Sequence, residues 1–368
     1  MRYGRDVLAK IPKTVHGGQA WKMKGIEDYS HNLNPLGPPE CLPEIIATAI
    51  DDIGHYPDDN CTELKAVLSK IFSLKEENLT IGSGSSEIIR NFPNAFIEKG
   101  EKVIINRPSF AEYSQQCRVA GIETVYNELT EEEDFRINSD KISAVRKGAK
   151  ALYICNPNNP TGRIEPRRKL LDLIKQCRDE GVLVFLDETL LELVPGHDEI
   201  SCVKYVNQYD NLVVAGSLTK SFAIPGIRIG YGIASPKLIE EMDKIRMTWN
   251  VGQIEQNVAR ILMSEHMGHV KKAADLMAKE SKVMNSRLNG IGFPAGNISD
   301  SFFYFCSLKK LGIKCSEFQK LMLKEKIMVR DCASFGERFD HYVRFSVKDG
   351  ERNEKFVKAA EVAIKSLR

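Results

Sequence analysis

The sequence has little net charge, no long apolar run and no low-complexity tract. Its 52 Lys and Arg residues against 50 Asp and Glu residues leave a formal charge of +2, which excludes the basic field of a general nucleic-acid-binding protein. No apolar run approaches the roughly 20 residues that a membrane-spanning helix needs, and the start of the chain lacks the apolar stretch of a secretory signal. We therefore expect a cytoplasmic protein that binds neither nucleic acid nor a membrane.

The nine cysteines include no C-x-x-C pair and lie far apart in the sequence. This pattern argues against a zinc site and a disulfide framework, so we expect no metal site and reduced, mostly buried thiols. Hydrophobic residues make up 42% of the chain, which excludes wholesale disorder because a chain this apolar can bury a large core. The length of 368 residues suggests about two domains.

Short apolar runs alternate with helical patterns through the middle of the chain. Seven strands are predicted, at 79–84, 102–108, 123–129, 151–159, 182–188, 212–220 and 228–234. Helices are predicted at 85–98, 110–120, 138–147 and about 165–180, and two longer ones follow at 236–247 and 253–288. Strands rich in Val, Ile and Leu that are separated by helices favour an α/β fold with a mostly parallel sheet covered on both faces.

The character of the sequence changes after residue 235, where long helical patterns replace the alternation. We expect an N-terminal segment, 1–40, that contributes to the active site and packs near the small domain. Residues 41–255 are expected to form the large domain. Residues 256–368 are expected to form a smaller C-terminal domain that includes a long linking helix, with a mixed α/β body at 290–368.

Polar residues follow the apolar strands in a regular way. Ligands of open α/β sheets bind beyond the carboxyl ends of the strands, so these residues are candidates for a site. A glycine turn that suits a phosphate follows the first strand at Gly82–Glu87, and later strand ends carry Asn156–Gly162, Asp187, Ser217–Lys220 and Arg228. Each feature alone has a simpler explanation as a turn, a helix cap or a solvated charge. Their occurrence together, in this order, indicates one site.

This series of motifs resembles the fold-type I enzymes of the aminotransferase class I/II family, which use pyridoxal 5′-phosphate (PLP). The resemblance extends from His16 to about Asn353 and implies a large domain with a mostly parallel seven-stranded sheet and a smaller α/β C-terminal domain. It implies that Lys220, in an S-x-x-K motif, bonds covalently to the cofactor aldehyde. Asp187 would pair with the pyridine nitrogen, because a buried carboxylate keeps that nitrogen protonated and lets the ring accept electrons.

The resemblance also implies contacts for the rest of the cofactor. Asn159, before Pro-Thr-Gly, would donate to its phenolic oxygen, and Phe110 would stack on its ring. Tyr56, in HYPD, matches a tyrosine that reaches the phosphate in the neighbouring subunit, which implies a homodimer with shared active sites. A packing role in the core is the alternative for both aromatic residues. The cofactor phosphate would be held by Gly84, Ser85, Ser86, Ser217 and Arg228.

Two branches of the family compete as the nearest: the histidinol-phosphate aminotransferases and the threonine-phosphate decarboxylases of cobalamin biosynthesis. Stretches similar to the decarboxylases are VHGGQ at 15–19, DYSHNLNPLGPP at 28–39, SLTKSFAIPGIRIGY at 217–231 and IMVRDCASF at 327–335. They imply PLP-dependent decarboxylation of L-threonine O-3-phosphate to (R)-1-amino-2-propanol O-2-phosphate. Amino transfer from histidinol phosphate to 2-oxoglutarate, and decarboxylation of L-serine O-phosphate, are the alternatives. A DNA-binding regulator on this scaffold would need an added DNA-binding segment, and none is evident in the sequence.

Both branches take phosphorylated amino compounds, so a second anion site beside that of the cofactor is expected. We expect Arg344, in YVRFSV, and Asn32 to hold the substrate carboxylate, and His16 and Arg330 to help hold its phosphate. The alternatives are a surface ion pair for Arg344, a turn cap for Asn32, an ordered loop for His16 and an ion pair with Asp331 for Arg330.

Two positions depart from the usual pattern of the family. Leu190 stands where most members carry a tyrosine that donates to the phenolic oxygen of the cofactor, which leaves Asn159 as the main partner there. The decarboxylases also tend to have an apolar residue at this position, which supports decarboxylation. Asp300-Ser301-Phe302 stands where many relatives have Ala-Asn-Phe, in the loop near the expected carboxylate site.

Overall fold

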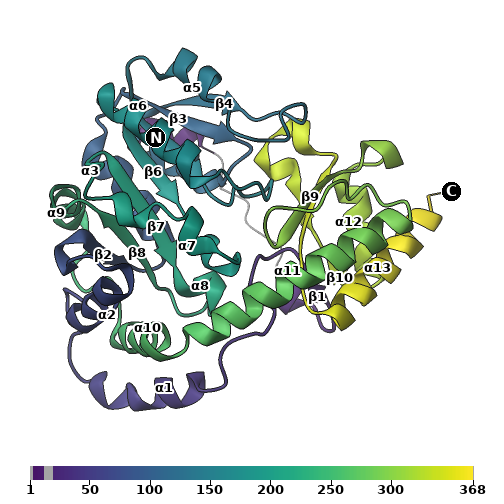
Figure 1. The fold of residues 1–368 in the computed structure, drawn as a ribbon, viewed down its shortest axis with the longest axis horizontal. Helices are drawn as coiled ribbons and strands as arrows, with labels where there is room; N and C mark the ends of the chain where they lie inside the picture. The colour runs from purple at the N-terminus through teal and green to yellow at the C-terminus, as the bar shows by residue number, and fades with distance from the viewer. Residues whose placement is uncertain (1–2, 12–19, 368) are drawn as a thin grey trace.

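A seven-stranded sheet forms the centre of the larger part of the molecule (Figure 1). The computed structural model describes residues 3–11 and 20–367. The strands are β2 (Leu79–Gly82), β3 (Lys102–Arg107), β4 (Glu123–Glu128), β5 (Ala149–Cys155), β6 (Leu183–Asp187), β7 (Leu212–Ser217) and β8 (Gly230–Ala234), in the spatial order β2-β8-β7-β6-β5-β3-β4. β8 is antiparallel to both of its neighbours, and the other pairs are parallel. The predicted mostly parallel, seven-stranded sheet is confirmed.

Both faces of this sheet are buried, which explains why its strands are almost continuously apolar. Along β5, Leu152 and Ile154 belong to one hydrophobic cluster, whereas Tyr153 and Cys155 belong to the other, as the two-residue repeat of a strand requires. The face of Tyr153 is covered by α3 (Ser85–Phe96), α4 (Ala111–Ala120) and α9 (Pro236–Ile245). The opposite cluster includes residues of α6 (Arg167–Asp179) and α10 (Gln253–Glu265).

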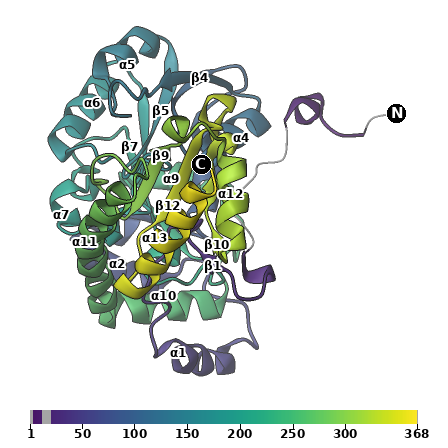
Figure 2. The same cartoon turned by 90° about the vertical axis from the view of Figure 1, so that its right-hand side faces the viewer.

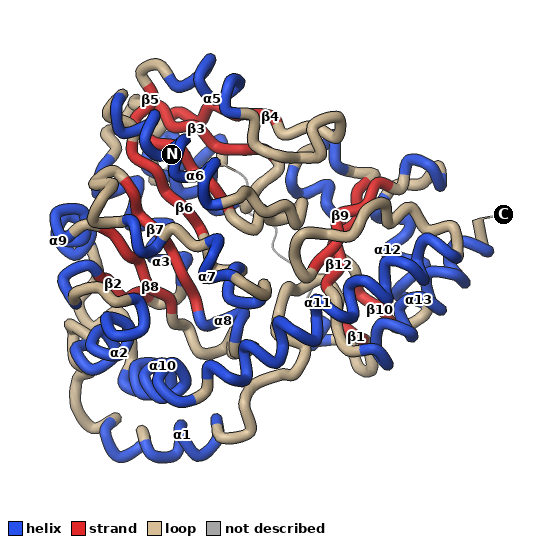
Figure 3. The backbone as a smooth tube through the Cα atoms, viewed as in Figure 1, coloured by secondary structure: helices blue, strands red, loops and turns tan. Residues whose placement is uncertain are grey.

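A second, antiparallel sheet lies in the C-terminal part of the chain, in the order β11-β12-β9. Its strands are β9 (Phe303–Ser307), β11 (Arg330–Asp331) and β12 (Tyr342–Ser346). It packs against α12 (Cys315–Lys324), and Phe345 of β12 packs against Phe356 of α13 (Gly350–Lys365). The long helix α11 (Met267–Gly290) runs from the large sheet toward this second sheet (Figures 1 and 3). Strand β1 (Glu27–Asp28) pairs in parallel with β10 (Ile327–Met328), so this early segment of the chain lies beside the C-terminal part (Figure 2).

The bounds of several elements differ from the predictions. The strand predicted over 151–159 ends at Cys155. The helix predicted over 253–288 is divided at His266 into α10 and α11. Met263 and Met267 stand on either side of this break at the spacing of four residues that is typical of a helix. The hydrophobic pattern therefore gives no sign of the break. The strand predicted over 212–220 ends at Ser217, whose hydroxyl caps a short helix, α8 (Leu218–Ser221), by accepting from the backbone N–H of Thr219 at 3.2 Å.

The other α-helices of the described residues are α1 (Leu42–Thr48), α2 (Thr62–Phe72), α5 (Ser139–Arg146) and α7 (His197–Ile200). Within this described part of the chain, none of the helices combines the length and the apolar character needed to cross a membrane. All nine cysteines are free thiols, and eight of them are buried.

Candidate active site

A cavity of about 340 Å³ lies beyond the carboxyl ends of β5, β6 and β7. This is the edge of the sheet at which the strand-end motifs predict a site. Side chains of β11 and β12 close the cavity from the second sheet, so both parts of the chain contribute to it. Its lining includes the predicted site residues Asn32, Ser85, Phe110, Asn159, Asp187, Lys220, Arg228, Arg330 and Arg344.

Lys220 follows β7 directly, in the short helix α8 that Ser217 caps. Burial, followed by the nearby positive charges of Arg344 and Arg228, lowers the pKa of Lys220 to about 8. A lysine with this pKa has a substantial neutral fraction near neutrality, whereas an ordinary lysine does not. The environment therefore prepares Lys220 to act as a nucleophile or a base.

Asp187 is the last residue of β6, and it is 3% exposed. Its Oδ2 accepts from the hydroxyl of Tyr113 at 2.6 Å, and its Oδ1 accepts from the backbone N–H of Thr189 at 2.9 Å. Burial raises the pKa of Asp187, and the two hydrogen bonds oppose this shift. Each carboxylate oxygen keeps a further lone pair with which it could accept from a cationic ring N–H.

Tyr113 is a site residue that the sequence motifs did not reveal. It lies on α4, one turn beyond Phe110, and it is 1% exposed. Its ring stacks on Tyr153 with the centroids 5.5 Å apart, and burial raises the pKa of its hydroxyl well above the usual value. This packing fixes the hydroxyl as a donor to Asp187. The signal in the sequence was a polar aromatic residue three positions after the predicted stacking residue.

Arg344 lies on β12 and enters the cavity from the second sheet. Its side chain is 6% exposed, and its Nη atoms donate to Asn159 Oδ1 and to the carbonyl oxygen of Ser30. Burial lowers the pKa of Arg344 to about 10. Among the described residues, Arg344 Nε and the nearby Asn32 Oδ1 are buried without a hydrogen-bond partner, which leaves polar capacity for a ligand. The alternative of a surface ion pair for Arg344 is wrong.

Arg330 lies beside Arg344 because β11 and β12 pair at these two residues. Its Nη2 donates to Ser334 Oγ at 2.8 Å, and burial lowers the pKa of Arg330. The Asp331 carboxylate caps the following turn, where it accepts from the backbone N–H of Ala333 at 2.9 Å. Two neighbouring guanidinium groups make this side of the cavity positive, which suits carboxylate and phosphate groups.

Four of the predicted phosphate residues, Gly84, Ser85, Ser86 and Arg228, lie at the N-terminus of α3. The fifth, Ser217, ends β7 outside the cavity lining, and its hydroxyl donates to the carbonyl oxygen of Ile229 at 3.3 Å. Arg228 Nη2 donates to Ser86 Oγ at 3.3 Å, and Ser85, the first residue of α3, lines the cavity. A Cβ atom on Gly84 would collide with the Arg228 guanidinium, and the φ of +77° also favours glycine there. The positive end of a helix dipole beside a guanidinium is a suitable place for a phosphate.

A model of the family described as "Aminotransferase class I and II" matches residues 26–359. The chain belongs to this family. Enzymes of the class I and II family depend on PLP, so this chain is a PLP-dependent enzyme, and its architecture is that of fold type I.

Relatives in both branches of the class I and II family cover nearly the whole chain. A "Putative threonine-phosphate decarboxylase" of Caldanaerobacter subterraneus subsp. tengcongensis is 33% identical over 95% of this chain and 94% of its own length. A histidinol-phosphate aminotransferase of Caldicellulosiruptor saccharolyticus is 30% identical over 96% of this chain and 98% of its own. The crystal structure of histidinol-phosphate aminotransferase from Sinorhizobium meliloti in complex with pyridoxal-5′-phosphate superposes with a TM-score of 0.88, at 21% identity, over 100% of this chain and 99% of that one.

The residues of the cavity fit the cofactor of the class I and II family. Lys220 and Asp187 would hold its aldehyde and its ring nitrogen, and the N-terminus of α3 with Arg228 would hold its phosphate. Phe110 lines the cavity beside Tyr113, with the ring centroids 5.7 Å apart, and would stack on the cofactor ring. These roles explain why a carboxylate and an amine with shifted pKa values are buried in one cavity.

Leu190, the departure from the family pattern, also lines the cavity and is 5% exposed. Its side chain has no hydrogen-bond donor, so it would offer the cofactor's phenolic oxygen only an apolar contact. Asn159, whose Oδ1 accepts from Arg344, would supply the amide donor for this oxygen.

Tyr56 lies outside the cavity. Its side chain is 72% exposed and stacks on Trp249 with the ring centroids 4.1 Å apart, so the alternative of a core packing role is wrong. The prediction that Tyr56 reaches a neighbouring subunit remains a prediction. His16 lies outside the described residues.

Proposed function

We propose that the chain decarboxylates L-threonine O-3-phosphate, with PLP as cofactor, to (R)-1-amino-2-propanol O-2-phosphate. The observation that carries this proposal is the pair of buried arginines, Arg330 and Arg344, side by side on β11 and β12. A substrate that brings both a carboxylate and a phosphate would neutralise the two guanidinium groups. The apolar Leu190 and the 33% identical relative favour the decarboxylase branch.

PLP, when bound, withdraws electrons from the α-carbon of the substrate, so that one bond of this carbon can break. The residues of the chain decide which bond it is. Arg344, with Asn32, binds the substrate carboxylate, and Arg330 binds the phosphate at the other end. Fixing both ends would set the orientation of the bond between the α-carbon and the carboxylate, and Phe110 would pack against the bound cofactor.

Two residues manage the protons. Asp187 would keep the ring nitrogen of the bound cofactor protonated, and the hydroxyl of Tyr113 keeps that carboxylate in position. Lys220 Nζ returns a proton to the α-carbon after carbon dioxide leaves. Its environment, which lowers the pKa to about 8, allows both the protonated and the neutral form near neutral pH.

Amino transfer is the second candidate. The 30% identical histidinol-phosphate aminotransferase favours it, and two arginines would also accept histidinol phosphate and 2-oxoglutarate in turn. Decarboxylation of L-serine O-phosphate differs by one methyl group, which is worth only about 1 kcal/mol in a pocket.

We also infer that the protein is a cytoplasmic homodimer. Large apolar side chains that lie close to Tyr56 and Trp249 in the sequence are also exposed, namely Ile50, Ile53 and Met247. Such a set is unusual on the free surface of a monomer and suits a contact between subunits. Sedimentation of the wild type should give twice the chain mass, and Tyr56→Ala should weaken cofactor retention. A monomer that binds PLP fully would overturn the shared-site arrangement.

Product analysis tests the reaction. The holoenzyme is offered L-threonine O-3-phosphate, L-serine O-phosphate, or histidinol phosphate with 2-oxoglutarate, and Lys220→Ala serves as the inactive control. We expect carbon dioxide and a phosphorylated amino alcohol from threonine phosphate. Glutamate formation from histidinol phosphate, with no carbon dioxide from threonine phosphate, would overturn the proposal.

A further inference from the structure

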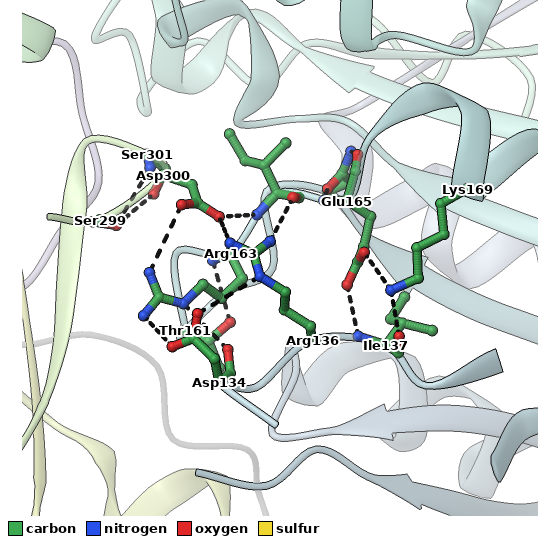
Figure 4. Close-up of polar contacts among 12 residues, drawn as sticks. Asp134, Arg136, Ile137, Thr161, Arg163, Glu165, Lys169, Ser299, Asp300 and Ser301 are labelled. Atoms are coloured by element: carbon green, nitrogen blue, oxygen red, sulfur yellow. Dashed lines mark hydrogen bonds and ion pairs between the residues drawn. The ribbon is translucent and has the colours of Figure 1, made fainter. Parts of the chain in front are cut away.

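Asp300, the residue that departs from the family pattern, lies where the second sheet meets the loops of the large sheet. It comes three residues before β9, the strand that pairs with β12 and so lies beside Arg344. Figure 4 shows its carboxylate facing Arg136 and Arg163, which belong to loops beside the large sheet. One carboxylate therefore faces two guanidinium groups across the junction.

The contacts of Asp300 close a ring around Ile164. Asp300 Oδ2 accepts from Arg136 Nη2 at 2.7 Å and from the backbone N–H of Ile164 at 3.1 Å. Arg136 Nη1 donates to the carbonyl oxygen of Ile164 at 3.0 Å, and Arg163 Nη1 lies 3.8 Å from Asp300 Oδ1. The backbone at Ile164 is thus held at both its N–H and its C=O groups.

This backbone is the end of the loop that carries Asn159. The carbonyl oxygen of Asn158 accepts from the backbone N–H of Gly162 at 2.8 Å. The backbone N–H of Asn158 donates to the carbonyl oxygen of Arg163 at 2.8 Å, so the loop folds back on itself. Gly162 packs directly on the turn around Asp300, because a Cβ atom there would lie 2.5 Å from Ser299 Oγ. Asp300 therefore binds the end of this loop outside the cavity, through the Ile164 N–H. Arg344 contacts Asn159 of the same loop inside the cavity.

We propose that Asp300 is a positioning residue that holds the second sheet, and with it Arg344, against the Asn159 loop in the arrangement that binds the substrate carboxylate. The proposal rests on the proposed role of Arg344. Without the Asp300 carboxylate, the one acidic partner that Arg136 and Arg163 keep among the described residues is Asp134, which belongs to the same loop region as Arg136. The junction then loses its charge pairing. A smaller fraction of molecules has Arg344 and Asn159 in the arrangement that binds the substrate carboxylate.

Loss of a binding-competent population has a defined kinetic signature. The apparent affinity falls by the fraction of molecules that are competent, whereas the bound complex reacts as before. The Asp300 side chain is 28% exposed, so its charge pairs are partly screened, and we expect Asp300→Ala to raise KM about fivefold with kcat changed less than about twofold. Asp300→Asn keeps an acceptor for the Ile164 N–H and should raise KM about threefold.

Asp134→Asn is the matched control. Within residues 3–11 and 20–367, Asp134 pairs with the same two arginines but with no residue of the second sheet, so the KM of Asp134→Asn should stay within about twofold of the wild type. Raising the salt concentration should move the ratio of KM values for Asp300→Ala and wild type toward one, because screening weakens the wild-type pairs. KM is measured with L-threonine O-3-phosphate, or with whichever offered substrate the wild type turns over.

Hydrogen exchange gives a readout that needs no substrate. A peptide spanning 156–166 should exchange faster in the Asp300→Ala holoenzyme than in the wild type or in Asp134→Asn, because the Ile164 N–H loses its acceptor. Unchanged exchange in Asp300→Ala would overturn the proposal. Faster exchange with an unchanged KM would also overturn it, since Asp300 would then be a structural contact only. Failure of the decarboxylation proposal leaves the exchange test intact, so the two failures are distinguishable.

Discussion

The rate at which the cofactor-free protein reacts with PLP should increase as the pH is raised through 8. The neutral amine of Lys220 is the form that attacks an aldehyde, and burial with two nearby arginines lowers its pKa to about 8. At pH 8, about half of the Lys220 side chains are neutral, against about 0.3% for a lysine with an ordinary pKa of about 10.5. The neutral, reactive fraction at pH 8 is therefore about 150 times that of an unperturbed lysine, and we expect the reaction with PLP to be correspondingly favoured.

Stopped-flow absorbance measures the rate of this reaction directly, because the visible absorption band of the bound cofactor appears after the protein and PLP are mixed. The rate should rise through a midpoint near pH 8 and level off above about pH 9. Nα-acetyl-lysine, measured over the same range, corrects for the protonation of PLP itself. A rate that still rises with pH near 10, in parallel with this model amine, would refute the assignment of Lys220 to a buried, cation-flanked site.

The cause of the shift is tested with charge variants. Arg344→Gln removes one of the two positive charges that disfavour the ammonium form, so the pKa of Lys220 should rise and the midpoint should move to higher pH. Lys355→Gln removes a positive charge from an exposed position on α13 and should leave the midpoint where it is. Equal shifts of the midpoint in both variants would indicate that the net charge of the protein, rather than the charges in the cavity, lowers the pKa of Lys220.

Three further outcomes are expected. Arg344→Ala should weaken substrate binding by about 2–4 kcal/mol, or about 30- to 900-fold, in a titration followed by cofactor absorbance, and unchanged affinity would remove Arg344 from the carboxylate site. Tyr113→Phe leaves Asp187 Oδ2 without its 2.6 Å donor and should lower the free energy of unfolding by about 1–3 kcal/mol in denaturant melts; equal stability would contradict the hydrogen bond. Asp187→Ala should lose most activity but retain some PLP, measured as turnover against bound cofactor, and full activity would refute its role.

The strand ends were predictable because parallel strands deliver their carboxyl ends to one edge of a sheet. Asp187, Lys220 and the Asn159 loop follow apolar runs that are buried on both faces, and such runs are easy to recognise. The resemblance then supplied the expected roles. The cavity contains these residues, which is what the order of motifs along the chain required.

Contacts between distant segments were not predictable from the sequence. The hydrogen bond between Tyr113 and Asp187 depends on how α4 packs on the sheet, and no pattern within either segment records it. The contact of Asp300 with Arg136 joins two loops on different sheets, and only the departure from the family pattern drew attention to Asp300. The break at His266 was missed because apolar residues continue on both sides of it.

The cavity takes residues from opposite ends of the chain, from Asn32 near the start to Arg344 near the finish. Domains generally fold as units during synthesis, beginning from the N-terminus. The large sheet, with Asp187 and Lys220, is therefore complete before β12 has been made. A newly made chain therefore acquires the residues that would hold the cofactor before it acquires Arg344, and we expect the capacity to bind PLP to arise earlier than the capacity to bind substrate.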